Sequence, residues 1–305
     1  MTAHAAPSRE PGAPLVRPAR RGFNWSFVGV LPFFLFAIVF MLFPIGFLVL
    51  GSFQDSNNGN ALTLQNYADL TSQQVARAFA NSIEISLVSA IAGALFGLLL
   101  AYAVILGGLP RFLRTFLMTF SGVASNFAGI PLALAFIFTV GNVGLLTGWI
   151  QAIFGVNLVT GVGLTLYSKI GLEIVYFYFQ LPLMVLIIAP AIDGLRKDWR
   201  EASENMGASP RQYWQYIALP ILLPSILGCT VLLFGNAFGA QATAYQLTSG
   251  QVPLVTLLIG AQISGDVLHN PGLGFAMAMG MVIIMGVSIL LYSILQRRSE
   301  RWLRS

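Results

Sequence analysis

The stretch FVGVLPFFLFAIVFMLFPIGFLVL occupies residues 27–50 and contains no charged side chain. A helix needs about 20 mostly apolar residues to cross a bilayer, whereas the apolar core of a signal peptide has about 7–15. The run is therefore too long for a signal peptide, although Arg17, Arg20 and Arg21 precede it. We expect residues 27–50 to form an uncleaved membrane-spanning helix.

Five further apolar stretches have the length of a span. They occupy residues 82–106, 115–140, 171–191, 220–240 and 273–295. Residues 145–162 are also apolar, but their glycines and polar side chains favour a short helix lying in the membrane interface. Residues 251–264 are too short to cross. The sequence thus predicts an all-α polytopic membrane protein with six transmembrane helices.

The composition excludes several classes of protein. Hydrophobic residues make up 56% of the chain and charged residues only 9%, and the mean hydropathy is +0.78. A soluble domain carries about 25% charged residues, which keep its surface in contact with water. This chain has too few charged residues to cover a globular surface in that way. A soluble enzyme, a nucleic-acid-binding domain and a disordered chain are therefore excluded, in spite of the net charge of +5.

The positions of the basic residues predict the orientation of the chain. With six spans and the N-terminus inside, 14 of the 16 lysines and arginines fall on the inner side, and only Arg77 and Lys169 lie outside. Positive charge accumulates on the cytoplasmic side of membrane proteins. We expect both termini in the cytoplasm, with a tail over residues 1–26, a membrane domain over 27–296 and a second tail over 297–305.

Side chains suited to catalysis or metal binding are scarce. The chain has one cysteine, Cys229, and two distant histidines, His4 and His269, so we expect neither a disulfide nor a metal cluster. A phosphate-binding loop needs glycine before its lysine, and neither Lys169 nor Lys197 follows one. We therefore expect no enzyme activity and no cofactor in this chain.

The most polar internal segment is the loop between the fourth and fifth spans, residues 192–219. Asp198 is a suitable N-cap with Glu201 three residues later, and Gly207 can end a helix in the left-handed conformation. Ser209 is a second N-cap, with Gln212 three residues on. The loop is predicted to form two short helices around Gly207. It is either a solvated amphipathic loop or a rigid knob that docks into another protein.

This loop resembles the EAA loop of permease subunits in binding-protein-dependent ABC importers. Glu201-Ala202-Ser203, then Gly207, then Ile217-x-Leu219-Pro220 match its spacing, with Ser203 in place of the second alanine. Segments 64–67 (Leu-Gln-Asn-Tyr) and 79–82 (Phe-Ala-Asn-Ser) resemble those that precede the second span in these permeases. The resemblance covers residues 27–296, and the single six-span unit looks most like the polyamine (spermidine/putrescine) branch.

The resemblance implies a type I importer permease in the cytoplasmic membrane, with the loop as the helix that couples it to an ATPase. It also implies a cytoplasmic ATPase dimer, a second permease subunit, identical or paralogous, and an extracytoplasmic solute-binding protein. The glutamate would pair with a basic residue of the ATPase or cap its own helix. The implied coupling residues are Glu201, Ala202, Ser203, Gly207, Ile217, Leu219 and Pro220. A secondary transporter or channel without ATP is the alternative, and a non-transporting membrane scaffold is a third.

A few polar side chains within the spans are candidates for the translocation pathway, because such groups are costly in lipid. They are Glu84, Tyr176, Gln180, Asn236 and Gln241. Each has a structural alternative, namely an interfacial position for Glu84 and interhelical packing or hydrogen bonding for the others. Lys169 and Glu173 lie four residues apart and are predicted to form an ion pair on one helix. The acids are too few to fix the solute, although aromatic side chains would suit an organic cation.

Overall fold

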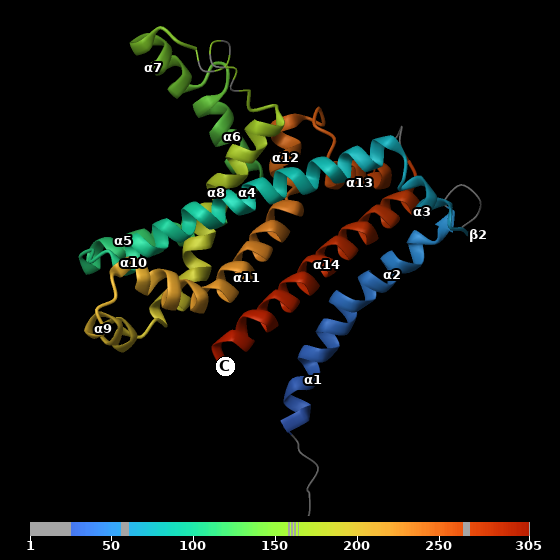
Figure 1. Ribbon diagram of the computed structural model, residues 1–305. Coiled ribbons are helices and arrows are strands. Elements are labelled where there is room, and N and C mark those ends of the chain that lie inside the picture. The colour runs from blue at the N-terminus through green and yellow to red at the C-terminus, as the bar shows by residue number, and fades with distance from the viewer. Residues whose placement is uncertain are drawn as a thin grey trace, which may run out of the picture. The chain divides into compact units, whose positions relative to one another are not determined.

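The computed structural model describes residues 26–55, 61–157, 159, 161, 163, 165–264 and 269–304 (Figure 1). The tail predicted over residues 1–26 therefore lies outside the described residues, apart from Ser26. The chain divides into two compact units, residues 1–47 and 48–305.

The first unit is a single apolar helical rod in its described part. It consists of α1 (Ser26–Ala37), a π-helical turn η1 (Ile38–Leu42) and the start of α2 (Phe43–Ser52). Its large hydrophobic side chains, such as Phe33 and Phe43, are exposed. An apolar helix that buries no face of its own needs lipid or another protein around it.

The second unit is a bundle around the long helix α4 (Gln73–Leu106), which packs most extensively on α8 (Lys169–Asp193) and α11 (Leu219–Phe238) (Figure 1). The other helices are α3 (Gln65–Asp69), α5 (Arg111–Asn126), α6 (Gly129–Val140), α7 (Leu145–Phe154), α9 (Lys197–Asn205), α10 (Pro210–Tyr213), α12 (Gln241–Thr248), α13 (Val255–Ser264) and α14 (Pro271–Arg304), with a π-helical turn η2 (Trp214–Ala218). Two short strands, β1 (Gln54–Asp55) and β2 (Ala61–Leu62), pair antiparallel before α3.

Small residues let α4 and α8 approach closely. A Cβ added at Gly93 would lie 2.7 Å from Cβ of Gln180, and one at Gly97 would lie 2.5 Å from Cβ of Met184. Membrane helices associate through such small-residue faces because lipid offers no hydrophobic drive between them. The core beside this contact is apolar and includes Ile188 and Leu233.

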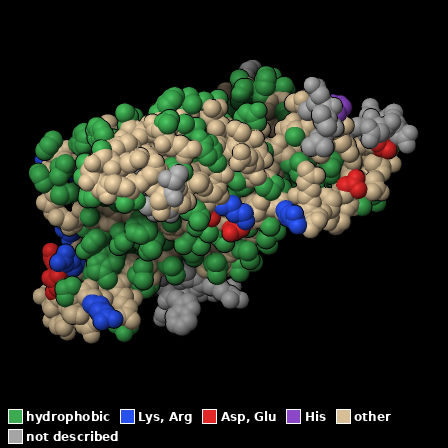
Figure 2. Space-filling model, turned by 90° about the horizontal axis from the view of Figure 1, so that it is seen from above, with side chains coloured by type: hydrophobic (Ala, Val, Ile, Leu, Met, Phe, Trp, Pro, Cys, Tyr) green, Lys and Arg blue, Asp and Glu red, His purple; other side chains and the backbone are tan. Residues whose placement is uncertain are grey.

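Six helical segments of the described chain are long and apolar enough to cross a membrane. They are Gly29–Ser52, Gln73–Leu106, Gly129–Phe154, Lys169–Asp193, Pro210–Phe238 and Pro271–Arg297. Figure 2 shows a face on which hydrophobic side chains are widespread and charged side chains are few. The prediction of an all-α protein with six spans is confirmed. All six segments overlap the predicted ranges, the third over residues 129–140 alone.

The third span differs from the prediction of one helix over residues 115–140. The chain forms α5 and α6 instead, separated by Phe127 and by Ala128, whose backbone is extended, and Gly129 then has φ of +73°. Pro131 favours this interruption because it has no N–H to donate within a continuing helix. Since α5 begins with charged residues, the apolar segment of span length is Gly129–Phe154, which joins α6 to α7. The number of crossings stays the same.

The two shorter apolar segments behave as short helices. α7 covers Leu145–Phe154, and α13 covers Val255–Ser264. The prediction that residues 251–264 are too short to span is consistent with the ten-residue length of α13. The interfacial position predicted for residues 145–162 disagrees with the span-length segment Gly129–Phe154, which includes α7, and it stays a prediction.

Candidate functional site

The polar loop between α8 and α11 folds as the predicted pair of short helices, α9 and α10, which we call the elbow (residues 197–213; Figure 1). The prediction that Asp198 caps the first helix is wrong. α9 begins at Lys197, so Asp198 falls within the first turn, where its carboxylate pairs with Arg196 at 2.6 Å. The carboxylate of Glu201 is exposed and makes no hydrogen bond or ion pair to a described residue, so it does not cap its own helix.

Gly207 makes the turn between the two helices, as predicted. Its φ is +81°, and its N–H donates to the Glu204 carbonyl at 2.9 Å while the Ala208 N–H donates to the Ser203 carbonyl at 3.0 Å. A Cβ at Gly207 would meet nothing within 4 Å. The glycine is therefore required by its left-handed backbone, which costs other residues roughly 1 kcal/mol, and not by crowding.

The second helix begins with the predicted capping box. The Gln212 N–H donates to Oγ of Ser209 at 3.3 Å, and the Ser209 N–H donates to Oε1 of Gln212 at 2.8 Å. Pro210 occupies the first turn, where its missing N–H is not needed. These local bonds give the elbow a defined shape without help from a partner.

One part of the elbow is buried and another faces outward. Ser203 and Tyr213 are buried against the bundle, and the ring of Trp214 packs edge-on against Tyr102 of α4 with centroids 4.9 Å apart. Ala202 and Gly207 are exposed, and Met206 is 79% exposed. The elbow therefore has an outward face that includes Glu201, Ala202 and Met206.

The remaining coupling candidates lie where the elbow joins α11. Ile217 and Pro220 are half-buried, and Leu219 is exposed. The Leu219 N–H donates to the Trp214 carbonyl, five residues earlier, and closes the π-helical turn η2. The three residues therefore belong to the continuous helix that enters the membrane, and the seven predicted coupling residues do not form one exposed patch.

The predicted Lys169–Glu173 ion pair is wrong. The Lys169 ammonium pairs with Oε2 of Glu84 on α4 at 2.9 Å. The side chains of the pair are 42% and 53% exposed, so the contact joins the first residue of α8 to the side of α4 at the surface. Helical spacing allowed an ion pair between Lys169 and Glu173. The packing of α8 on α4 brings a second carboxylate, that of Glu84, within reach of Lys169.

Two of the pathway candidates are inside the helix bundle. Tyr176 is 2% exposed, and its hydroxyl donates to the Ala240 carbonyl at 2.7 Å. Gln180 is completely buried, and its Nε2 donates to Oγ of Ser89 at 2.9 Å, while its Oε1 finds no partner among the described residues. In this conformation both side chains hold helices together, as in the structural alternative. Asn236 and Gln241 are exposed.

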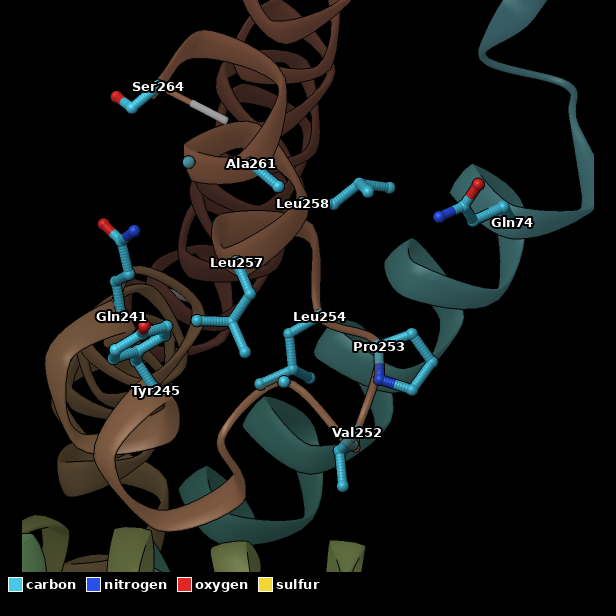
Figure 3. A pocket seen from close by; sticks show the side chains of 12 residues that line it. Gln74, Gln241, Tyr245, Val252, Pro253, Leu254, Leu257, Leu258, Ala261 and Ser264 are labelled. Atoms are coloured by element: carbon cyan, nitrogen blue, oxygen red, sulfur yellow. The ribbon is translucent and has the colours of Figure 1, made fainter. Parts of the chain in front are cut away.

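An open cavity of about 640 Å³ lies between α4, α12 and α13 (Figure 3). Gln74 of α4 and Gln241 and Tyr245 of α12 contribute polar groups, and Leu254 and Leu257 are among its apolar lining residues. No charged side chain belongs to the lining of this cavity in the described chain. Sequence reasoning found Gln241 and missed Tyr245, although its position four residues later on a polar helix could have indicated it.

Hydrogen bonds from α4 hold the loop between α12 and α13 beside this cavity. Nδ2 of Asn81 donates to the Pro253 carbonyl at 2.9 Å, and the Val255 N–H donates to Oγ of Ser82 at 2.9 Å. The earlier segment has a similar role, because Nδ2 of Asn66 donates to the carbonyls of Ser52 and Gln54. Both segments singled out by the resemblance thus fasten loops to helices. Among the described residues, no group of three His, Cys, Asp or Glu side chains could hold a metal.

Comparison with curated proteins identifies distant permeases. The probable sulfate transport system permease protein cysT of Anthoceros angustus is 28% identical over 192 residues, which cover 61% of each chain. The spermidine/putrescine transport system permease protein PotB of Haemophilus influenzae is 30% identical over 129 residues, covering 42% of this chain and 44% of PotB. The chain thus matches about three fifths of the length of the first relative and less than half of the second.

Comparison with solved structures and family models agrees with the fold. A chain of a bacterial ABC transporter involved in the import of the acidic polysaccharide alginate superposes with a TM-score of 0.71 and 17% identity, covering 90% of this chain and 96% of that chain. Residues 93–305 match the family described as binding-protein-dependent transport system inner membrane component. The chain therefore belongs to this family of inner membrane permeases.

Proposed function

We propose that this chain forms half of the translocation pathway of an ATP-driven importer and is coupled to a cytoplasmic ATPase through the elbow. The observation that carries the proposal is the shape of the elbow. Its caps and its left-handed Gly207 fix two helices that present Glu201, Ala202 and Met206 outward. A rigid, partly apolar surface with an unpaired carboxylate suits docking into a groove of another protein better than contact with water alone.

The partners of this proposal follow from what one permease chain lacks. Its sequence contains no phosphate-binding loop, so ATP hydrolysis takes place in a separate ATPase dimer. Six spans make one half of the pathway, and a second permease, identical or paralogous, supplies the other. The family description supports an extracytoplasmic solute-binding protein, and a related solved structure is an alginate transporter in complex with a ligand-bound periplasmic protein.

The proposed orientation places both termini and the elbow in the cytoplasm. It rests on the distribution of lysine and arginine, 14 of which fall on one side with an even number of crossings. The same orientation places the cavity of Figure 3 and the Glu84–Lys169 pair on the outer side. Of the five pathway candidates, Glu84, Asn236 and Gln241 are exposed. Because Glu84 is paired with Lys169, Asn236 and Gln241 are then best placed to meet a solute delivered from outside.

The solute is the finer part of the proposal. The relatives that match long segments are named as sulfate permeases, which favours an oxyanion. The polyamine-type alternative is supported by the similarity to PotB. Binding of labelled sulfate and labelled spermidine to the cognate solute-binding protein distinguishes them, because binding of one solute without the other decides the class.

The coupling role is tested with the complete transporter in proteoliposomes. Glu201→Lys reverses the unpaired carboxylate, and Gly207→Pro forbids the left-handed backbone, so we expect both to abolish solute-stimulated ATPase activity while membrane insertion stays normal. Lys197→Glu is the matched control, a charge reversal on the same helix outside the motif. Wild-type stimulation in both test variants contradicts docking through the elbow. Solute flux without any ATPase subunit would instead support a channel or secondary transporter.

A further inference from the structure

A second pocket lies where the elbow meets the membrane helices. It has a volume of about 350 Å³ and lies between Tyr102 near the end of α4, Arg200 and Glu204 of α9, and Arg211 and Trp214 beyond the turn. It combines basic and aromatic side chains, in contrast to the uncharged cavity of Figure 3. None of these five residues belongs to the coupling motif.

The pocket carries excess positive charge. Nε of Arg200 donates to Oε1 of Glu204 at 2.8 Å, which leaves the outer nitrogens of this guanidinium without a described partner. Arg211 is exposed, and its guanidinium group forms no hydrogen bond or ion pair with any residue that the structure describes. Two guanidinium groups therefore face one carboxylate. Guanidinium groups bind phosphate oxygens through paired N–H donors, so the pocket suits a phosphate group.

An exposed apolar stripe leads away from the pocket along α4. Ile91, Leu95, Leu99 and Tyr102 recur at helical spacing, and each is between 41% and 55% exposed. From Ile91 to Tyr102 the helix rises about 16 Å, which is close to half of a hydrocarbon core of about 30 Å. The stripe thus has the length and the apolar character of a binding surface for an acyl chain, and the basic pocket lies at its end.

The aromatic rings add the features of a membrane interface. Tyr102 and Trp214 pack edge to face, and Tyr and Trp are enriched at the level of lipid headgroups. Oγ of Ser209 accepts the Gln212 N–H, so its own hydroxyl proton stays available for an anion. A soluble phosphate compound would use the arginines and the hydroxyl but would gain nothing from the adjoining apolar stripe.

From this arrangement we propose that the pocket binds the phosphate group of an anionic phospholipid, whose acyl chain lies along α4. The lipid joins α4 to both helices of the elbow, and therefore stiffens the connection between the membrane bundle and the coupling surface. The inference uses the membrane location of the family but does not depend on docking of an ATPase.

The test measures lipid retention by the purified full-length chain with native mass spectrometry. Wild-type protein is exchanged into mixed micelles that contain equal amounts of phosphatidylglycerol and phosphatidylcholine. We expect preferential retention of phosphatidylglycerol, reduced about fivefold by Arg200→Gln or Arg211→Gln and about 30-fold by both together. Arg111→Gln is the control, since it removes an equal charge from the start of α5 outside the pocket.

Equal retention of the two lipids by the wild type, or unchanged retention by the double variant, overturns the proposal. Two further measurements need no variant. Dihexanoyl phosphatidylglycerol, which has the same headgroup and short tails, should bind more weakly than the dioleoyl lipid. Inorganic phosphate that displaces the lipid at equal concentration would assign the pocket to a soluble anion and refute the role of the stripe. Because transport is not the readout, failure here leaves the coupling proposal untouched.

Discussion

The contact between α4 and α8 allows a stability prediction from measured distances. In Gly97→Ala the new methyl group would lie 2.5 Å from Cβ of Met184 and 2.9 Å from the carbonyl oxygen of Leu181. Favourable contacts between carbon atoms need about 3.5–4.0 Å, so α8 must retreat by roughly 1 Å. Overpacking of this kind costs about 1–3 kcal/mol. The substitution also changes helix propensity, so it needs a matched comparison.

Gly286→Ala provides that comparison. Gly286 lies within α14, and a Cβ there would meet nothing within 4 Å. Both variants gain the propensity of alanine, about 1 kcal/mol, so their difference isolates the packing cost. At about 2–4 °C per kcal/mol, we expect the melting midpoint of Gly97→Ala to lie at least about 2 °C below that of Gly286→Ala.

The single cysteine supplies the assay. Cys229 lies in α11, is 6% exposed, and packs in the core beside α4 and α8. A thiol-reactive fluorescent dye therefore reacts when this core opens, and its signal during heating in detergent gives the midpoint. Equal midpoints for the two glycine variants would refute the claim that Gly97 is required for close approach of α8.

Three further predictions concern hydrogen bonds and charges. Asn81→Leu leaves the Pro253 carbonyl without its donor, at a cost of about 1–3 kcal/mol. Hydrogen exchange should therefore accelerate in the loop between α12 and α13, and unchanged exchange there contradicts the role of this bond. Ser209→Ala removes the capping box at a cost of about 1 kcal/mol, and exchange should rise in α10 but not in α9. A double-mutant cycle should give Lys169 a coupling of about 0.2–1 kcal/mol with Glu84 and a smaller one with Glu173. A larger coupling with Glu173 would restore the pairing along one helix.

The sequence predicted the features that depend on neighbouring residues. Apolar runs long enough to cross a bilayer predicted the helical class and the number of spans, because crossing depends on the length and the composition of a segment. The turn at Gly207 and the bonds between Ser209 and Gln212 were also predicted, since the groups involved lie within five residues. The prediction that Asp198 caps a helix was wrong, and the reason is also local. α9 starts one residue before Asp198, and Arg196 offers its carboxylate a different partner.

Features that depend on distant packing were not predictable from spacing. Lys169 forms its ion pair with Glu84, which is 85 residues away in the sequence, and not with Glu173, which is four residues away. Gln180 looked like a pathway residue because it is polar within a span, but its amide is enclosed where Gly93 lets α8 approach α4. The sequence did not predict the basic pocket beside the elbow. In the sequence, Arg200 and Arg211 indicate only the cytoplasmic side of the membrane, and it is the fold that brings Tyr102 beside them.

Pro220, at the end of the EAA-like sequence, has a structural role that also appears elsewhere in the chain. The π-helical turns η1 and η2 are each closed by the residue before a proline, Phe43 before Pro44 and Leu219 before Pro220. Proline has no N–H and crowds the carbonyl four residues earlier, so an ordinary helix would kink there. A wider turn just before the proline accommodates the ring, and the helix continues from Pro210 to Phe238. The second arm of the elbow is therefore continuous with the fifth span. Under the proposed coupling, force that an ATPase applies to the elbow would pass into the membrane through this single helix.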